Sequence, residues 1–97
     1  MAIGVLIDLP GVTQAQYGAA IRKLHPNGEF DKLSGWPVKG ILMHVAGPTG
    51  KGWRVVDVWQ SEEAFRKFAG ILIPILKDLD FPEVRPQIFP VFRFVKD

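Results

Sequence analysis

The stretch Trp53-Arg-Val-Val-Asp57-Val-Trp59-Gln-Ser61-Glu-Glu-Ala64-Phe65 decides the fold of this 97-residue chain. Its first half alternates between two faces, which predicts a strand. One face carries Trp53, Val55, Asp57 and Trp59, and the other carries Arg54, Val56 and Val58. Ser61 is a good N-cap, and the two glutamates after it favour the positive end of a helix. The stretch therefore predicts a strand that leads directly into a helix.

Upstream of this stretch, the sequence predicts two more strands and another helix. The apolar run Ile3–Leu9 ends at the turn signal Pro10-Gly11 and predicts a buried strand. Thr13 and Gln16 have the spacing of a capping box, and an apolar stripe follows at helical spacing: Tyr17, Ala20, Ile21 and Leu24. That helix should end at His25-Pro26, where we expect His25 to act as a charge partner of the helix C-terminus. Gly40–Ala46 predicts a strand, followed by a turn over Gly47–Gly52.

The remaining segments are less regular. Residues Asn27–Lys39 predict a long loop in which Phe30 and Trp36 either line a lid over a pocket or seal the end of the sheet. Pro74 lies within the second helix, so we expect a kink or a break near Ile71–Ile73. Gln87–Val95 predicts a last strand, and Pro90 within it favours a sheet edge or a bulge.

The predicted order is β-α-β-β-α-β, which is the ferredoxin-like α+β pattern. We expect one domain over residues 1–97, with a four-stranded antiparallel sheet and both helices on one face. If Gly47 faces Gly52, His44 lies opposite Val55 and diagonal to Asp57. On that register one face carries His44, Trp53, Asp57 and Trp59, and the other carries Ile41, Met43, Val45, Val56 and Val58.

Both predicted sheet faces are largely apolar, and the helices can cover only one of them. The chain is 47% hydrophobic, and large exposed apolar patches mark interfaces. The sequence therefore predicts a homodimer in which two sheets pack face to face.

Composition and charge exclude several classes of function. The chain has no cysteine, which removes disulfides, thiol nucleophiles and cysteine-ligated metals and suits a cytoplasmic location. Its net charge is +2 with scattered basic residues, so we expect no nucleic-acid partner. No apolar run reaches the roughly 18–20 residues of a membrane span, so no membrane partner is expected. His25 and His44, the only histidines, lack a metal-ligand spacing, and we expect no metal site.

His44 and Asp57 are the candidate catalytic residues, because an ionisable pair in an apolar cleft can serve as acid and base. The alternative is a satisfied structural pair, or an Asp57 that bonds the start of the second helix. Candidate substrate-binding residues are Trp59, Tyr17, Trp53 and Trp36. Each has a structural alternative: the tryptophans as core or rim, and Tyr17 as a helix residue with a solvated hydroxyl.

The stretch Trp53–Phe65, together with His44-Val-Ala-Gly-Pro48, resembles the antibiotic-biosynthesis-monooxygenase-like branch of the dimeric α+β-barrel superfamily. That resemblance implies a pocket between the sheet and the helices, into which His44, Asp57 and Trp59 would project. Members include cofactor-free monooxygenases of polycyclic phenols, haem-degrading enzymes, polyketide cyclases, lactone isomerases and proteins without known activity. The haem enzymes use a histidine on a helix of the second half, and this chain has none after His44, so haem is not expected.

Three functions remain open at this point. The first is a cofactor-free enzyme, monooxygenase-like, that acts on a small apolar, aromatic or polyketide-like molecule. The second is a cyclase or isomerase of the same fold. The third is a non-catalytic ligand-binding or stress-response dimer in which His44 and Asp57 are structural. Fold analogy alone does not choose among them.

Overall fold

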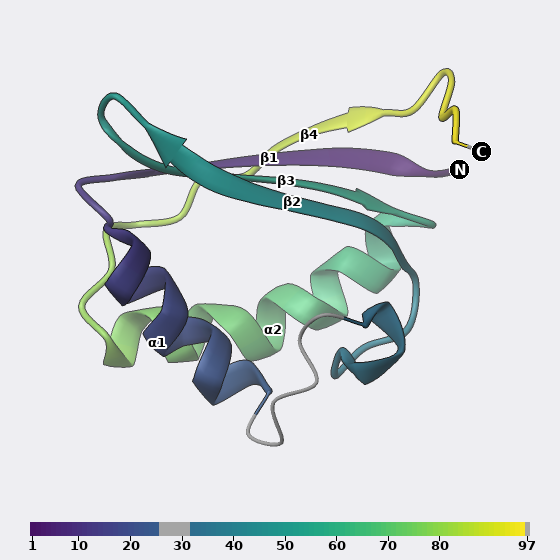
Figure 1. The fold of residues 1–97 in the computed structure, drawn as a ribbon. Helices are drawn as coiled ribbons and strands as arrows, with labels where there is room; N and C mark the ends of the chain where they lie inside the picture. The colour runs from purple at the N-terminus through teal and green to yellow at the C-terminus, as the bar shows by residue number, and fades with distance from the viewer. Residues whose placement is uncertain (26–31, 97) are drawn as a thin grey trace.

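The computed structural model describes residues 1–25 and 32–96, and it has the predicted order of elements. The elements are β1 (Ile3–Pro10), α1 (Gln14–Leu24), a short 3-10 helix (Leu33–Gly35), β2 (Ile41–Thr49), β3 (Gly52–Trp59), α2 (Glu62–Asp78) and β4 (Gln87–Pro90). The strands form one antiparallel sheet in the order β2-β3-β1-β4. Both helices lie on one face of that sheet (Figure 1). The predicted ferredoxin-like fold is confirmed.

Both helices begin where the sequence predicts. Before α1, the Thr13 hydroxyl accepts a hydrogen bond from the Gln16 backbone N–H at 3.2 Å, and the Gln16 side chain accepts one from the Thr13 N–H at 2.8 Å. This capping box satisfies two of the free N–H groups at the helix start. Before α2, the Ser61 hydroxyl accepts from the Ala64 N–H at 3.1 Å. Local side-chain chemistry therefore sets both helix starts.

The register that we expected for the β2–β3 hairpin is wrong by two residues. β2 continues to Thr49, which pairs with Gly52, so the turn contains only Gly50 and Lys51. Two-residue loops are the commonest hairpin connection because their twist matches that of the strands. The shorter turn places His44 directly opposite Asp57 rather than diagonal to it. Because the shift is an even number of residues, the face assigned to each of these side chains is unchanged.

Ile41 lies on the other side of the sheet from the one we expected. The β2–β3 ladder shifts between Ile41 and Met43, so that Ile41 pairs with Trp59 while Met43 pairs with Val58. This irregularity turns Ile41 into the core, where it is buried with the side chains under the sheet.

Two expectations concern elements that contain a proline. α2 runs without a break from Glu62 to Asp78, although Pro74 removes one backbone donor. The Gly70 carbonyl therefore lacks its usual donor within the helix. Gly70 and Pro74 are both exposed, so water can donate to this carbonyl instead. The last strand ends at Pro90 rather than at Val95, and beyond it Val91 makes a single backbone bond to Ala2. β4 is an edge strand, as Pro90 indicated.

The core occupies the layer between the sheet and the helices. β1 contributes alternate residues, β3 contributes three of its inward side chains, and α2 contributes an aromatic pair. The main members are Ile3, Val5, Ile7, Leu9, Trp53, Val55, Trp59, Phe65 and Phe68. Full burial of each large apolar side chain stabilises the fold by about 1.5–3 kcal/mol. Neither helix of the described chain is long and apolar enough to cross a membrane.

The opposite face of the sheet is covered by neither α1 nor α2 (Figure 1). Its central positions follow from the strand register and are Leu6, Met43, Val45, Val56, Val58 and Phe89. We call these six residues the outer face. Val45 is 54% exposed and Phe89 is 51% exposed.

Gly52 begins β3 beside the backbone of β1, and a Cβ added at Gly52 would overlap the Leu9 carbonyl oxygen and lie 2.6 Å from the Gly11 nitrogen. These are backbone atoms that cannot turn aside, so Gly52→Ala should lower the free energy of unfolding by about 1–3 kcal/mol. Gly47→Ala is the matched control, because nothing lies within 4 Å of its added Cβ. Urea unfolding measures both variants. Equal stability of the two variants would contradict this account of the packing between β1 and β3.

Candidate functional site

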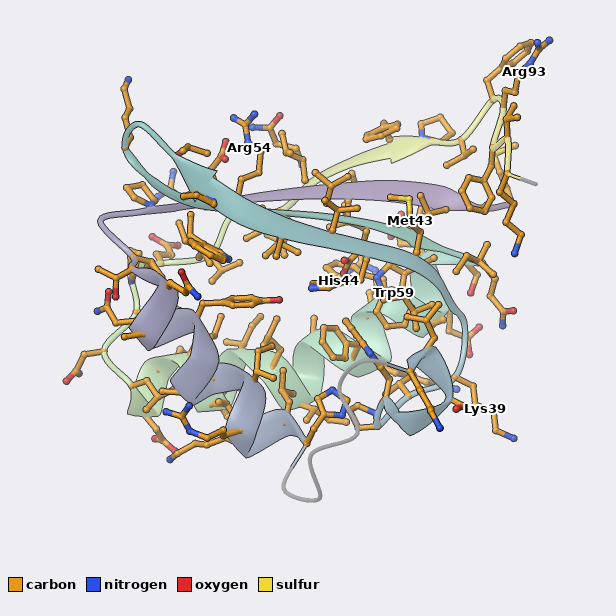
Figure 2. All side chains as sticks on the ribbon, in the orientation of Figure 1. Lys39, Met43, His44, Arg54, Trp59 and Arg93 are labelled. Atoms are coloured by element: carbon orange, nitrogen blue, oxygen red, sulfur yellow. The ribbon has the colours of Figure 1, made fainter. Side chains whose placement is uncertain are left out.

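His44 and Asp57 form a buried pair at the centre of the β2–β3 hairpin. His44 Nδ1 lies 2.6 Å from Asp57 Oδ1, and the two side chains are 13% and 2% exposed. Both project toward the helices, and Figure 2 shows His44 and Trp59 in the layer below the sheet. A carboxylate accepts hydrogen bonds, so the geometry assigns the proton of a neutral His44 to Nδ1 and leaves Nε2 as an acceptor.

Tyr17 occupies that acceptor. Its hydroxyl lies 2.6 Å from His44 Nε2, and it comes from α1, so the contact joins the helix layer to the sheet. Burial raises the pKa of the Tyr17 phenol, and the negative charge of Asp57 raises it further. Tyr17 therefore stays protonated and donates to His44. Tyr17, His44 and Asp57 form one directed hydrogen-bond chain from α1 to β3.

Asp57 receives a second hydrogen bond, from Trp59. The Trp59 indole N–H donates to Asp57 Oδ2 at 3.2 Å, so each carboxylate oxygen has its own donor. The two residues are two apart on β3 and therefore share a face. Trp59 is 0% exposed, and its position is in the core. We call Tyr17, His44, Asp57 and Trp59 the polar network.

Trp36 covers the network from the side of the irregular segment. Its ring meets the His44 ring edge-on at 4.9 Å between centroids and packs against Phe68 at 5.3 Å. It is 8% exposed, so it closes this end of the layer between sheet and helices. Phe30, the other aromatic residue of the predicted loop, lies outside the described residues.

His25 contacts the Trp36 segment, and its burial disfavours the role of charge partner at the helix C-terminus that we expected. It is 5% exposed, its Nδ1 lies 3.1 Å from the Gly35 carbonyl, and its ring contacts Trp36 edge-on at 5.6 Å. Burial lowers the pKa of His25, while the Gly35 bond opposes that shift. Its neutral form is therefore favoured, with Nδ1–H donating to the carbonyl. The sequence position of His25, at a helix end and before a proline, does not distinguish a buried neutral histidine from a charge partner of the helix.

A cavity of about 50 Å³ lies between the sheet and the helices beside the polar network. Tyr17, Trp36, His44 and Asp57 line it. The rest of its lining consists of hydrocarbon and aromatic side chains: Ile7, Leu9, Ala20, Ile21, Leu24, Val55, Phe68, Leu72, Leu76 and Phe81. The volume suits a few water molecules, whereas pockets for drug-sized ligands measure roughly 300–1,000 Å³. Trp53 and Trp59 are absent from the lining.

Trp53 and Tyr17 form part of a second, open hollow. A groove of about 710 Å³ runs along α1, lined by Gln14, Ala15, Tyr17, Gly18, Ile21, Arg22 and Trp53. The Tyr17 and Trp53 rings lie 5.1 Å apart. Tyr17 and Ile21 line both the outer groove and the inner cavity.

Hydrogen bonds join four of the six predicted site residues, and the sequence did not predict this pattern of bonds. It indicated that His44 and Asp57 share a face, but it did not predict that Tyr17 and Trp59 bond to that pair. The sequence did hold one indication that Tyr17 lies near the pair. Tyr17 belongs to the apolar stripe of α1, and that stripe must face the sheet. Within residues 1–25 and 32–96, no group of three or more His, Asp or Glu side chains is placed to hold a metal ion.

The fold is a ferredoxin-like α+β fold, and its structural neighbours include antibiotic biosynthesis monooxygenase-like proteins. SnoaB, a cofactor-independent oxygenase from Streptomyces nogalater, superimposes with a TM-score of 0.63 at 12% identity, covering 99% of this chain and 97% of that chain. A protein from Deinococcus radiodurans, assigned as an antibiotic biosynthesis monooxygenase, gives 0.60 at 11% identity over 100% and 98%. A dimeric ferredoxin-like protein from an uncultured marine organism gives 0.59 at 15% identity over 99% and 92%.

At these identities the likeness shows the shared fold. No family model and no curated protein matches the sequence.

Tyr17 is the only tyrosine of the chain, so its titration can be read directly from tyrosinate absorbance. In the folded protein we expect the phenolate to form well above the ordinary pKa of about 10, whereas the urea-unfolded chain should titrate near that value. Because the unfolded state releases this proton first, stability should fall as the pH rises above about 10. Asp57→Asn should lower the pKa of Tyr17 by removing the carboxylate charge. An ordinary titration in the folded protein would contradict the network.

Proposed function

We propose that this protein is a cofactor-free, monooxygenase-like enzyme that acts on an apolar aromatic substrate with an acidic proton. The observation that carries the proposal is the unbroken hydrogen-bond chain Tyr17–His44–Asp57 at the wall of an apolar cavity. In such surroundings a histidine held by a carboxylate is a suitable general base. The fold that the chain shares with a protein described as a cofactor-independent oxygenase supports the same chemistry.

The proposed reaction starts with removal of a proton from the substrate. Once Tyr17 has moved aside, His44 Nε2 takes the substrate proton, and Asp57 stabilises the resulting imidazolium. The substrate carbanion then reduces dioxygen with its own electrons. The reacting carbon of the substrate is a CH₂ group next to the aromatic system. One oxygen atom becomes a carbonyl oxygen on that carbon, and the other leaves as water with the two hydrogens of the CH₂ group. The electron balance closes between substrate and dioxygen alone.

The substrate route follows from the position of Tyr17. The inner cavity of about 50 Å³ is too small for a polycyclic phenol, whereas the outer groove of about 710 Å³ is within the usual range for ligands. Tyr17 lines both spaces. We propose that the substrate lies first in the groove beside Trp53 and reaches His44 when the Tyr17 side chain moves aside.

Oxygen uptake in the presence of a panel of polycyclic phenols tests this function. Asp57→Asn and His44→Ala should each lower the rate by about 100-fold or more, the usual contribution of general base catalysis. Asp78→Asn is the control, because Asp78 is an exposed carboxylate at the end of α2 and lines neither the inner cavity nor the outer groove.

The two other functions give different results in that assay. A cyclase or isomerase would convert its substrate under nitrogen, with the same dependence on His44 and Asp57. A non-catalytic ligand-binding protein, the alternative that the small, satisfied cavity favours, would turn over none of the phenols. In that case Asp57→Asn would lower stability only, because it disturbs a buried hydrogen-bonded pair.

We also propose that a second copy of the chain covers the outer face to give a dimeric α+β barrel. The outer face is apolar across three strands at Met43, Val45, Leu6, Val56 and Val58, and a two-fold axis would let it pack against itself. Past β4, the Phe92 side chain is 95% exposed in the single chain. The neighbouring fold described as a dimeric ferredoxin-like protein supports this assembly.

Sedimentation equilibrium should give about twice the 10.8 kDa chain mass at micromolar concentration. Val45→Asp, at a position 54% exposed on the outer face, should shift the protein to the monomer because it would bury an unpaired charge in the interface. Leu33→Asp is the matched control, since Leu33 is 40% exposed but lies in the short 3-10 helix. A monomeric wild type, or equal effects of both variants, would contradict this interface.

A further inference from the structure

We propose that Trp59 is a positioning residue that fixes the Asp57 carboxylate and thereby the tautomer of His44. This role differs from the substrate wall that the sequence suggested for this tryptophan. The inference rests on the proposed function only for its catalytic consequence. Its structural part concerns the hydrogen bonds of the polar network.

The first step is the location of Trp59. It is 0% exposed and lies outside the lining of the inner cavity and of the outer groove. Its indole packs against Phe68 at 5.1 Å and meets Phe65 edge-on at 6.0 Å. A ring held in this way has little freedom to turn, so its N–H has a fixed direction. That direction leads to Asp57 Oδ2 at 3.2 Å.

The second step is the effect on Asp57. An ionised carboxylate in the core needs donors on its oxygens, and here the two oxygens use different ones. His44 bonds Oδ1 at 2.6 Å, and Trp59 bonds Oδ2. With Oδ2 held by a rigid ring, the carboxylate cannot rotate about its Cβ–Cγ bond without losing a buried hydrogen bond. Oδ1 therefore stays aimed at His44 Nδ1.

The third step is the effect on His44. The proton of a neutral imidazole resides on the nitrogen that faces the better acceptor, which sets the role of the other nitrogen. As long as Oδ1 faces Nδ1, Nε2 remains free of a proton and accepts from Tyr17 at 2.6 Å. If the carboxylate turned away, the tautomer with the proton on Nε2 would become populated and could not accept that bond. Trp59 thus acts on the base through Asp57.

Nitrogen NMR of the labelled protein tests the structural part, because the chain has only two histidines and His44→Ala identifies the signals of His44. The wild type should show one neutral tautomer with the proton on Nδ1. Trp59→Phe keeps an aromatic ring but removes the donor, and it should give a mixture of both tautomers. Trp53→Phe is the matched control, because the buried Trp53 indole N–H has no hydrogen-bond partner among the described residues. A single unchanged tautomer in Trp59→Phe would overturn the proposal.

A measurement on the wild-type tryptophan keeps the test decisive if Trp59→Phe does not fold. The Trp59 indole proton should exchange slowly with water and should shift in Asp57→Asn, which replaces its charged acceptor. The Trp53 indole proton should not shift. If neither indole signal responds to Asp57→Asn, Trp59 does not hold the carboxylate.

Kinetics separates positioning from substrate contact once a turnover substrate is known. Trp59→Phe should lower kcat by about 10-fold, as loss of a supporting hydrogen bond often does, and should leave KM unchanged. A raised KM with an unchanged kcat would instead assign Trp59 to substrate binding and overturn the positioning role. If no substrate turns over, the proposed function fails while the tautomer experiment still decides the role of Trp59.

Discussion

The buried carboxylate of Asp57 is the constraint on which the arrangement of the site depends. A charge at 2% exposure is costly unless hydrogen bonds replace its water shell. Two neighbours on the sheet supply them, His44 from β2 and Trp59 from β3 itself. The His44 ring then has one nitrogen left, which Tyr17 of α1 satisfies. One buried charge therefore links the hairpin to the helix layer.

The polar network also depends on the register of the β2–β3 hairpin. His44 meets Asp57 because the turn contains two residues, and a turn two residues longer would place Val55 opposite His44 instead. The apolar pattern would be unchanged by that shift, because side chains return to the same face every second residue. A pattern of alternation thus predicts which side chains face the helices, but it does not predict which of them pair.

The sequence predicts best where the deciding interaction is local. The capping signals at Thr13 and Ser61 involve side chains three residues from their partners, and both helix starts lie where these signals place them. It fails where tertiary packing outweighs a local tendency. Pro74 predicts a kink or a break, and the break does not occur, because the buried side of α2 packs the helix against the sheet through Ala64, Phe65, Phe68 and Leu76. Ile41 turns inward through an irregular ladder that the periodicity does not reveal.

The hydrogen bonds of the polar network restrict which ligand could enter the small inner cavity. The side-chain polar atoms of His44 and Asp57 already have hydrogen-bond partners, and apolar side chains form most of the lining of the cavity beside them. A ligand that moves Tyr17 aside must give His44 Nε2 a new donor, or a buried acceptor is left unpaired. A phenol can do so, but a hydrocarbon of the same shape cannot. Sites built around such a bond discriminate strongly against analogues that lack the hydroxyl. The hydrogen bond that closes the site would therefore also select what enters it.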